Sequence, residues 1–140
     1  MQVFIVGTPF ETAVALDKRR LRKQIIECGQ IIDAINGKKA WRNHPCTIQY
    51  RGNVQWLEIY QRTLELYEQG DCYAELCSQE AARYKPKFHT KEYFDQMKRR
   101  LYTKDNVHYK RWANLGESSV NWYWSPRENK FIKYDKGKRI

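Results

Sequence analysis

The stretch from Asp17 to Ile31, DKRRLRKQIIECGQI, combines two kinds of side chain that chemistry on a nucleic acid requires. Five cations come first, and a carboxylate, Glu27, follows among them. The cations are Lys18, Arg19, Arg20, Arg22 and Lys23. A clamp for phosphates needs only cations. A carboxylate surrounded by cations stays charged near neutral pH and can accept a proton or stabilise a cationic sugar, so the stretch indicates a catalytic group inside a phosphate-binding surface.

A helix is the element that gathers these groups. At 100° per residue, Arg19, Arg20, Lys23, Glu27 and Gln30 fall within about a third of the helical circumference, opposite an apolar stripe. The stripe consists of Leu21, Ile25, Cys28, Ile32 and Ile35. The simpler alternative is that Lys23 and Glu27 form an i,i+4 surface pair that contributes only a few tenths of a kcal/mol.

The flanking elements are predicted from caps and apolar spacing. Thr8, Pro9 and Glu11 indicate a helix start, with a break near Asp17 and a stop at Asn36 and Gly37. Residues 37–53 are expected to be irregular and exposed to a ligand. Further helices are expected at 54–69, 71–83 and 90–102, and 121–135 permits a small hairpin. The predicted fold class is mainly α: a single compact helical domain over residues 1–135, followed by a basic tail over 136–140.

Composition limits the class of protein. The 140 residues include 26 lysines and arginines and 16 acids, which gives a net charge of +10. This charge favours a polyanionic partner, and double-stranded DNA is the first candidate. Five tryptophans, ten tyrosines and five phenylalanines favour a folded core over a basic tail. No apolar run has membrane-spanning length, so we expect no membrane contact and a cytoplasmic monomer of a bacterium or a phage-infected cell. The four cysteines contain no CxxC pair, so no metal site and no cofactor is predicted.

Other candidate contacts with nucleic acid lie outside the long helix. The loop of Trp41, Arg42, Asn43 and His44 is one candidate. We expect its tryptophan to insert into a base stack and its polar groups to contact an opened base or a phosphate. A rigid structural loop without DNA contacts explains these residues equally well. Phosphate contacts are expected from Lys98, Arg99, Arg100 and Lys104, although a solvated helix face explains the first three as well. His108 and Tyr109 suit phosphate contacts too, but packing explains them at least equally well. Trp122, Tyr123 and Trp124 suit base stacking, but core packing explains them better.

Four blocks of the sequence together resemble one family. The residues Leu16, Asp17, Arg20, Leu21, Lys23, Gln24 and Glu27 match the pattern L-D-x-x-R-L-x-K-Q-x-x-E. The blocks WRNHP at 41–45, LYTKDNVHY at 101–109 and Trp122, Tyr123, Trp124 with Pro126 follow in order. This pattern resembles small bacterial and phage proteins described as pyrimidine dimer DNA glycosylases, relatives of phage endonuclease V.

The resemblance implies a helical domain that binds damaged duplex DNA. In endonuclease V-like enzymes the N-terminal amine attacks the sugar C1′, a glutamate assists, and the resulting imine permits β-elimination. The matching glutamate is Glu27, and Gln24 joins the DNA-contacting set. Because Gln2 disfavours methionine removal, Met1 would supply the amine, with Lys23 as the substitute nucleophile.

Two functions are therefore in competition. The first is a DNA glycosylase with associated lyase activity on damaged, pyrimidine dimer-type or modified DNA. The alternative is a non-catalytic DNA-binding module of phage or mobile-element origin, in which the helices on either side of Gly70 resemble a helix-turn-helix.

Overall fold

The computed structural model describes residues 3–38, 40–115, 120–125, 127–128 and 130–140, with the backbone alone for 120–124 and 131. The chain divides into two compact units, Met1–Pro86 and Lys87–Ile140. The described part is mainly helical, as predicted. None of its helices has the length and apolar character that crossing a membrane requires.

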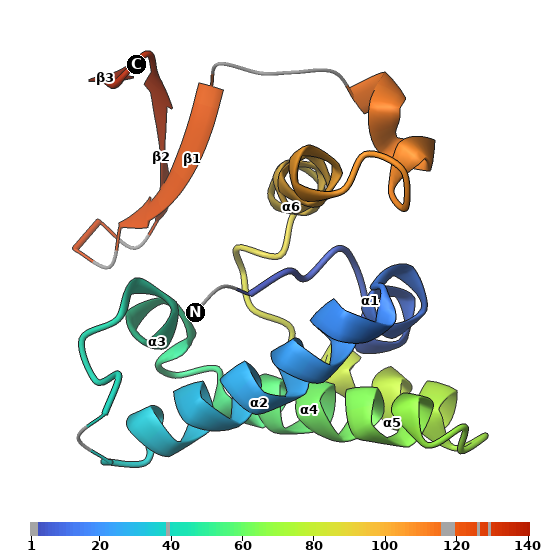
Figure 1. Ribbon diagram of the computed structural model, residues 1–140. Coiled ribbons are helices and arrows are strands. Elements are labelled where there is room, and N and C mark those ends of the chain that lie inside the picture. Colours follow the sequence, from blue (N-terminus) through green and yellow to red (C-terminus); the bar gives the residue numbers. More distant parts are fainter. Residues whose placement is uncertain (1–2, 39, 116–119, 126, 129) are drawn as a thin grey trace. The chain divides into compact units, whose positions relative to one another are not determined.

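The first unit is a set of helices packed around α4 (Val54–Glu68), which contacts α1 (Pro9–Ala15), α2 (Lys18–Ile35) and α5 (Ala74–Glu80). The long helix α2 lies along α4 (Figure 1). A short 3-10 helix, η1 (Ala81–Tyr84), continues α5.

The predicted helix boundaries at the start of the chain are confirmed. Thr8 and Glu11 form a reciprocal capping box at α1, in which the Thr8 hydroxyl accepts from the Glu11 N–H and the Glu11 carboxylate accepts from the Thr8 N–H, both at 3.1 Å. The chain leaves the helix at Leu16, and Asp17 caps α2 by accepting from the Arg20 N–H. Two caps in succession explain why one apolar stretch forms two helices.

The prediction that residues 37–53 are irregular throughout is wrong. Pro45–Tyr50 form a short helix, α3, that contacts α2. Pro45 stands at its first turn, where the missing N–H costs nothing, and the His44 ring nitrogen Nδ1 accepts from the Cys46 N–H at 3.1 Å. An imidazole cap before proline is a weaker signal than serine or aspartate, which is why the helix was missed.

The core of the first unit combines aliphatic and aromatic side chains. Trp56 stacks between Tyr50 and Tyr60, with ring centroids at 6.2 and 5.1 Å. The Cys28 thiol is buried and donates to the Leu57 carbonyl at 3.4 Å. This contact ties α2 to α4.

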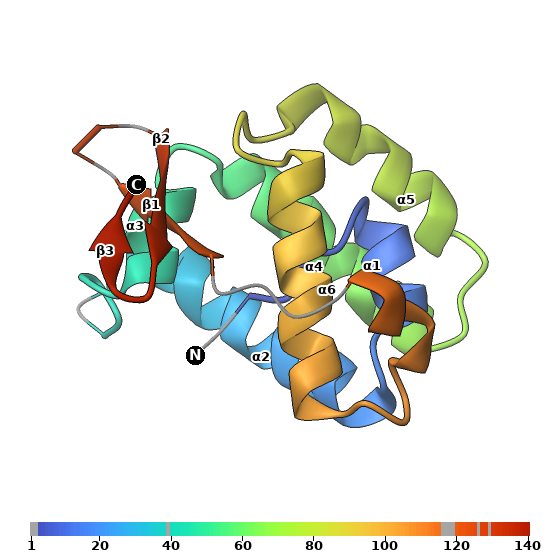
Figure 2. The ribbon, with the colours of Figure 1, turned by 90° about the horizontal axis from the view of Figure 1, so that it is seen from above.

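The second unit contains α6 (Lys91–Lys104), a 3-10 helix η2 (Lys110–Leu115) beside it, and a small antiparallel sheet (Figure 2). The sheet has the order β1 (Val120–Ser125), β2 (Lys130–Asp135), β3 (Lys138–Arg139). The predicted hairpin is confirmed, with Tyr123 opposite Ile132.

Residues 136–140 include the last turn and the last strand of this sheet. Lys136 and Gly137 have φ values of 50° and 81° and form a two-residue turn between β2 and β3. Positive φ at both positions suits the twist of a tight hairpin. Arg139 then forms an ion pair with Glu128 at 3.1 Å, and this hydrogen-bonded partner lowers the pKa of the Glu128 carboxyl.

Candidate active site

The helix α2 is buried on a wider arc than its apolar stripe predicts. Leu21, Ile25 and Cys28 of the stripe are buried, but so are Gln24 and Glu27, of which the latter is only 7% exposed. The expectation that Glu27 faces away from the core is therefore corrected. The apolar segment after the start of the chain, residues 3–6, supplies part of the added cover, as its hydrogen bond to Gln24 shows.

Gln24 connects three segments through one oxygen. Its Oε1 accepts from the Phe4 N–H at 2.7 Å and from the Tyr60 hydroxyl at 3.0 Å, and all three residues are buried. Further along, the Val6 N–H donates to the Thr12 hydroxyl at 3.2 Å. The backbone of residues 4–6 is therefore held against α2 at one end and against α1 at the other.

Glu27 lies one helical turn beyond Gln24, at the boundary between interior and solvent. Lys23 Nζ is 3.6 Å from Glu27 Oε1, and the Lys23 side chain is 71% exposed. An exposed ammonium beside a buried carboxylate gives a modest ion pair and leaves the amine accessible to a substrate. The two candidate reacting groups predicted in this helix thus lie side by side.

Acids partner several of the predicted cations of α2. Arg20 pairs with Asp17 at 3.1 Å, and Arg22 pairs with Glu68 of α4 at 2.9 Å. Lys18 and Arg19 are exposed, and the described residues give them no ion pair. The first turn of α2 therefore carries its accessible positive charge on Lys18 and Arg19.

The WRNHP loop is stiffened by its own contacts. Trp41 adopts a left-handed backbone (φ 63°), and its ring lies 5.8 Å from that of His44, edge to face. The Arg42 carbonyl accepts from the Arg51 guanidinium at 3.0 Å. Trp41 and Asn43 are nevertheless exposed, so the rigid-loop interpretation and the DNA-contact interpretation are compatible in this loop.

The remaining predicted contacts belong to the second unit. Arg99 donates through Nε to the Leu115 carbonyl at 3.2 Å, while Arg100 is half-buried and Lys104 and His108 are exposed. Tyr109 is fully buried and stacks on Trp112 with ring centroids at 5.3 Å. Burial explains Tyr109 as packing, so it carries no part of the DNA-contacting surface proposed below.

Met1, the predicted nucleophile, lies outside the described residues, as do the side chains of Trp122, Tyr123 and Trp124. The described residues contain no group of three or more His, Cys, Asp or Glu side chains that could hold a metal ion. Burial, with a smaller contribution from Glu65, raises the pKa of the Cys28 thiol, so this cysteine is a poor nucleophile.

Tyr60 and Thr12 are two hydrogen-bonding residues near the candidate site that the sequence analysis does not single out. The Thr12 hydroxyl accepts from the Val6 N–H, whereas the Tyr60 hydroxyl donates to Gln24 Oε1, the oxygen that also accepts from the Phe4 N–H. Both residues are fully buried. Tyr60 was expected only as an apolar position of its helix. No local pattern reveals that its hydroxyl meets Gln24, because that contact joins residues 36 positions apart.

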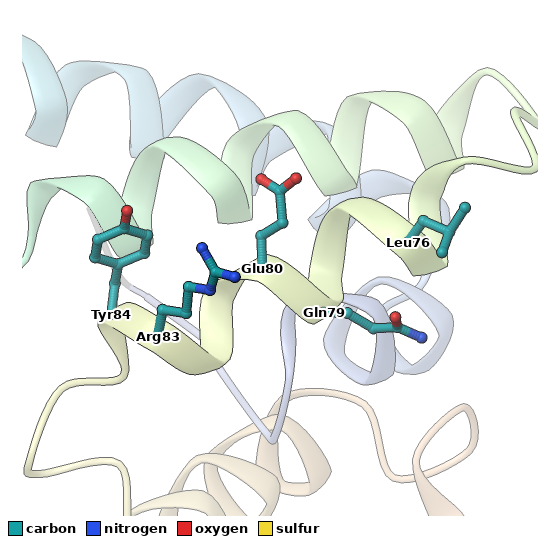
Figure 3. Close-up of a pocket in the computed structure, with 5 residues that line it drawn as sticks. All are labelled: Leu76, Gln79, Glu80, Arg83 and Tyr84. Carbon is teal, nitrogen blue, oxygen red and sulfur yellow. The ribbon is translucent and has the colours of Figure 1, made fainter.

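A pocket of about 400 Å³ lies elsewhere in the first unit, on α5 and η1 (Figure 3). One helical stretch supplies its lining, Leu76, Gln79, Glu80, Arg83 and Tyr84, and all five residues are exposed. It is a surface hollow that contains none of the predicted site residues. The acids Glu75 and Glu80 on α5 also suit a DNA recognition helix poorly, since they would repel phosphates.

Comparison with known proteins gives one match. No curated protein and no solved structure matches the chain. The matched segment ends with the last residue of α4 and includes Gln24, Glu27 and the WRNHP loop, whereas the blocks at 101–109 and 122–126 lie beyond it. Residues 1–68 match the model of a family described as pyrimidine dimer DNA glycosylase, and this match confirms the family resemblance that the sequence predicts.

Proposed function

We propose that the protein is a DNA glycosylase with associated lyase activity on damaged or modified pyrimidine sites in duplex DNA. The observation that carries the proposal is the hydrogen bond from the Phe4 N–H to Gln24 Oε1, at 2.7 Å. Three extended residues reach about 10 Å, and one helical turn rises about 5 Å. A three-residue extension from Phe4 is therefore long enough to bring a chain-terminal amine to Glu27.

The proposed reaction begins with a neutral amine. An α-amine titrates near pH 8, so it supplies free nucleophile at neutral pH, unlike an ordinary lysine. The amine nitrogen of Met1 forms a bond to C1′ of the damaged nucleotide, and the bond from C1′ to the pyrimidine nitrogen breaks. The pyrimidine leaves with the electron pair and is neutralised by a proton. Lys23 is the substitute nucleophile, being next to Glu27 and exposed.

Glu27 has two roles in this proposal. As a carboxylate it stabilises the positive charge that develops on the sugar. It then accepts a proton from the attacking amine nitrogen and returns it to the ring oxygen O4′ as the C1′–O4′ bond breaks to give the imine. Loss of a C2′ proton then expels the 3′ phosphate and cleaves the strand. None of these steps needs a metal or an oxidant.

The test is borohydride trapping on duplexes that carry a thymine dimer or an abasic site, with chelator present. We expect a covalent adduct on the abasic duplex, and peptide mapping should locate it at Met1 rather than at Lys23. Lys23→Gln should leave the adduct if Met1 is the nucleophile. No adduct on either duplex, with salt-sensitive binding still present, would contradict the proposal and favour the non-catalytic DNA-binding module.

Glu27→Gln separates chemistry from binding. We expect at least a 100-fold slower strand cleavage, in the range of a lost general base, with unchanged affinity for damaged duplex. The measurement is single-turnover cleavage beside an anisotropy titration. Asp33→Asn is the matched control, because it removes an exposed carboxylate from the same helix. Tighter binding by Glu27→Gln without any loss of cleavage would show that the carboxylate only forms a structural ion pair with Lys23.

A further inference from the structure

The positive charge of the chain is concentrated in the second unit. Residues 87–140 hold 14 lysines and arginines against 6 acids, whereas residues 1–86 hold 12 against 10. Eight of the ten net charges therefore belong to the unit that the family match does not reach. A field of this kind attracts polyanions, so the second unit needs its own explanation.

In both units the described residues include ion pairs within the unit. In the first unit Arg20, Arg22, Lys23 and Lys38 each lie within 4.0 Å of a carboxylate. In the described part of the second unit the ion pairs are Lys91 with Asp95 and Arg139 with Glu128. Six acids cannot neutralise fourteen cations, so this unit keeps a net charge of +8 that attracts an external anion.

Trp112 of η2 organises one group of these cations. Its ring stacks on the buried Tyr109, with an interplanar angle of 3°, and is therefore held in place. The Arg111 guanidinium lies 4.6 Å and the Lys98 ammonium of α6 5.9 Å from the centre of the same ring. Contacts of this kind stabilise a cation by roughly 0.5–1 kcal/mol at exposed sites.

Like charges held against one ring repel each other unless an anion joins them. Among the described residues no carboxylate lies within ion-pair distance of Lys98 or Arg111, and Lys110 is an exposed neighbour in the same helix. The arrangement is therefore complementary to a phosphate group. The cations come from two helices but meet at one fixed aromatic ring, which lowers the entropic cost of binding.

We propose that Lys98 and Arg111, which contact the Trp112 ring, and the exposed Lys110 of the same 3-10 helix as Arg111 form a phosphate-binding surface. Through it the second unit holds the backbone of duplex DNA without regard to sequence. The choice of DNA among polyanions rests on the proposed function. A membrane is a poorer partner because the large exposed apolar side chains in the described part of this unit are Val107 and Ile140 alone. In this proposal the first unit provides the reacting groups, and the second unit provides affinity for the DNA backbone.

The test compares two double variants of the full chain with equal net charge. Lys98→Gln/Arg111→Gln removes the proposed contacts, and Arg62→Gln/Lys85→Gln removes two exposed cations of the first unit. Binding of a short undamaged duplex is measured by fluorescence anisotropy between about 50 and 200 mM salt. We expect the slope of log K against log salt to become shallower by about 2 for the first variant, or about 1 per lost contact, and by less than half of that for the control.

Several outcomes would overturn the proposal. Equal slope changes in the two double variants, or no change in either, would show that the surface is not specific. Equal or greater loss of binding to a single-stranded RNA of the same length would make RNA the better ligand. Lys110→Gln, which is exposed, should by itself reduce the slope by about 1, and this tests the surface even if the double variant unfolds.

The same proteins distinguish this inference from the proposed function. If wild type forms no adduct but the slope difference is present, the proposed chemistry fails and the binding surface stands. If the adduct forms but the slopes do not differ, the binding surface fails and the chemistry stands.

Discussion

At the residue scale, Gln24 is the side chain on which the candidate site depends most. It is buried in α2, and one oxygen receives both the Phe4 N–H and the Tyr60 hydroxyl. A side chain that holds the beginning of the chain against the helix of Glu27 is a positioning residue for the proposed amine.

Gln24→Leu should lower the free energy of unfolding by about 1–3 kcal/mol for each buried donor left unpaired. It should also reduce trapping at Met1 by roughly 10²-fold, because the segment that carries the amine loses its anchor. Gln61→Leu is the matched control, since Gln61 also donates from α4 to α2, at the Ile25 carbonyl. The readouts are chemical denaturation and the partition of the borohydride adduct between Met1 and Lys23. If Gln24→Leu and Gln61→Leu form the Met1 adduct equally well, the role of Gln24 is purely structural.

Cys28 should be inert to thiol reagents in the folded protein. Burial raises the pKa of its thiol, whereas Cys72 is exposed. We expect rapid alkylation of Cys72 and protection of Cys28 until the chain unfolds, measured by mass spectrometry of tryptic peptides. Because the thiol of the unfolded chain ionises near pH 9.0 and the folded one does not, the contribution of Cys28 to stability is full below that pH and falls above it. Alkylation of Cys28 at the rate of Cys72 under native conditions would contradict the burial.

At the element scale, the caps decide where α1 and α2 begin. The capping box of Thr8 and Glu11 satisfies two backbone N–H groups, and Asp17 starts the next helix two residues after α1 ends. The break between the helices lets α1 turn back onto α4 and α5 while α2 runs along α4. The chain segment of residues 3–6 therefore comes to lie against α2.

Thr8→Ala should lower the free energy of unfolding by about 0.5–2 kcal/mol, the usual effect of losing an N-cap. Thr103→Ala is the control, because Thr103 lies inside α6 and its hydroxyl only donates back to the Arg99 carbonyl. We expect that control to change stability little, since alanine is the better residue in a helix interior. Urea denaturation of both variants checks this. Equal destabilisation by the two changes would mean that the cap at α1 contributes nothing of its own.

At the scale of the whole molecule, a net charge of +10 acts on association rather than on chemistry. We expect kcat/KM for damaged duplex to fall steeply as salt rises, while kcat at saturating DNA stays nearly constant, because screening weakens capture of the polyanion but not the reaction of bound substrate. Steady-state and single-turnover kinetics over a salt series provide the measurement. A parallel fall of kcat would show that salt disturbs the reacting groups themselves.

The sequence by itself determined the helical class, the caps at Thr8 and Asp17, the hairpin near the end of the chain and the family resemblance, because each follows from local chemistry or from a short motif. It also identified Glu27 and Lys23 as neighbours, since residues four apart share a helix face. The sequence does not predict α3, because the cap at its start is a weak signal. Nor does it predict the turn at Lys136 and Gly137, because the basic composition of residues 136–140 gives no clear turn signal.

Only the tertiary structure decided that Gln24 and Glu27 are buried and that Tyr60 and Phe4 share the Gln24 oxygen. It alone also decided that Lys98 and Arg111 both lie near the Trp112 ring. Helical periodicity shows which residues share a face. It cannot show which other faces of a helix are buried, because the segments that cover those faces come from residues far away in the sequence. Such contacts depend on how helices pack, which no local pattern encodes.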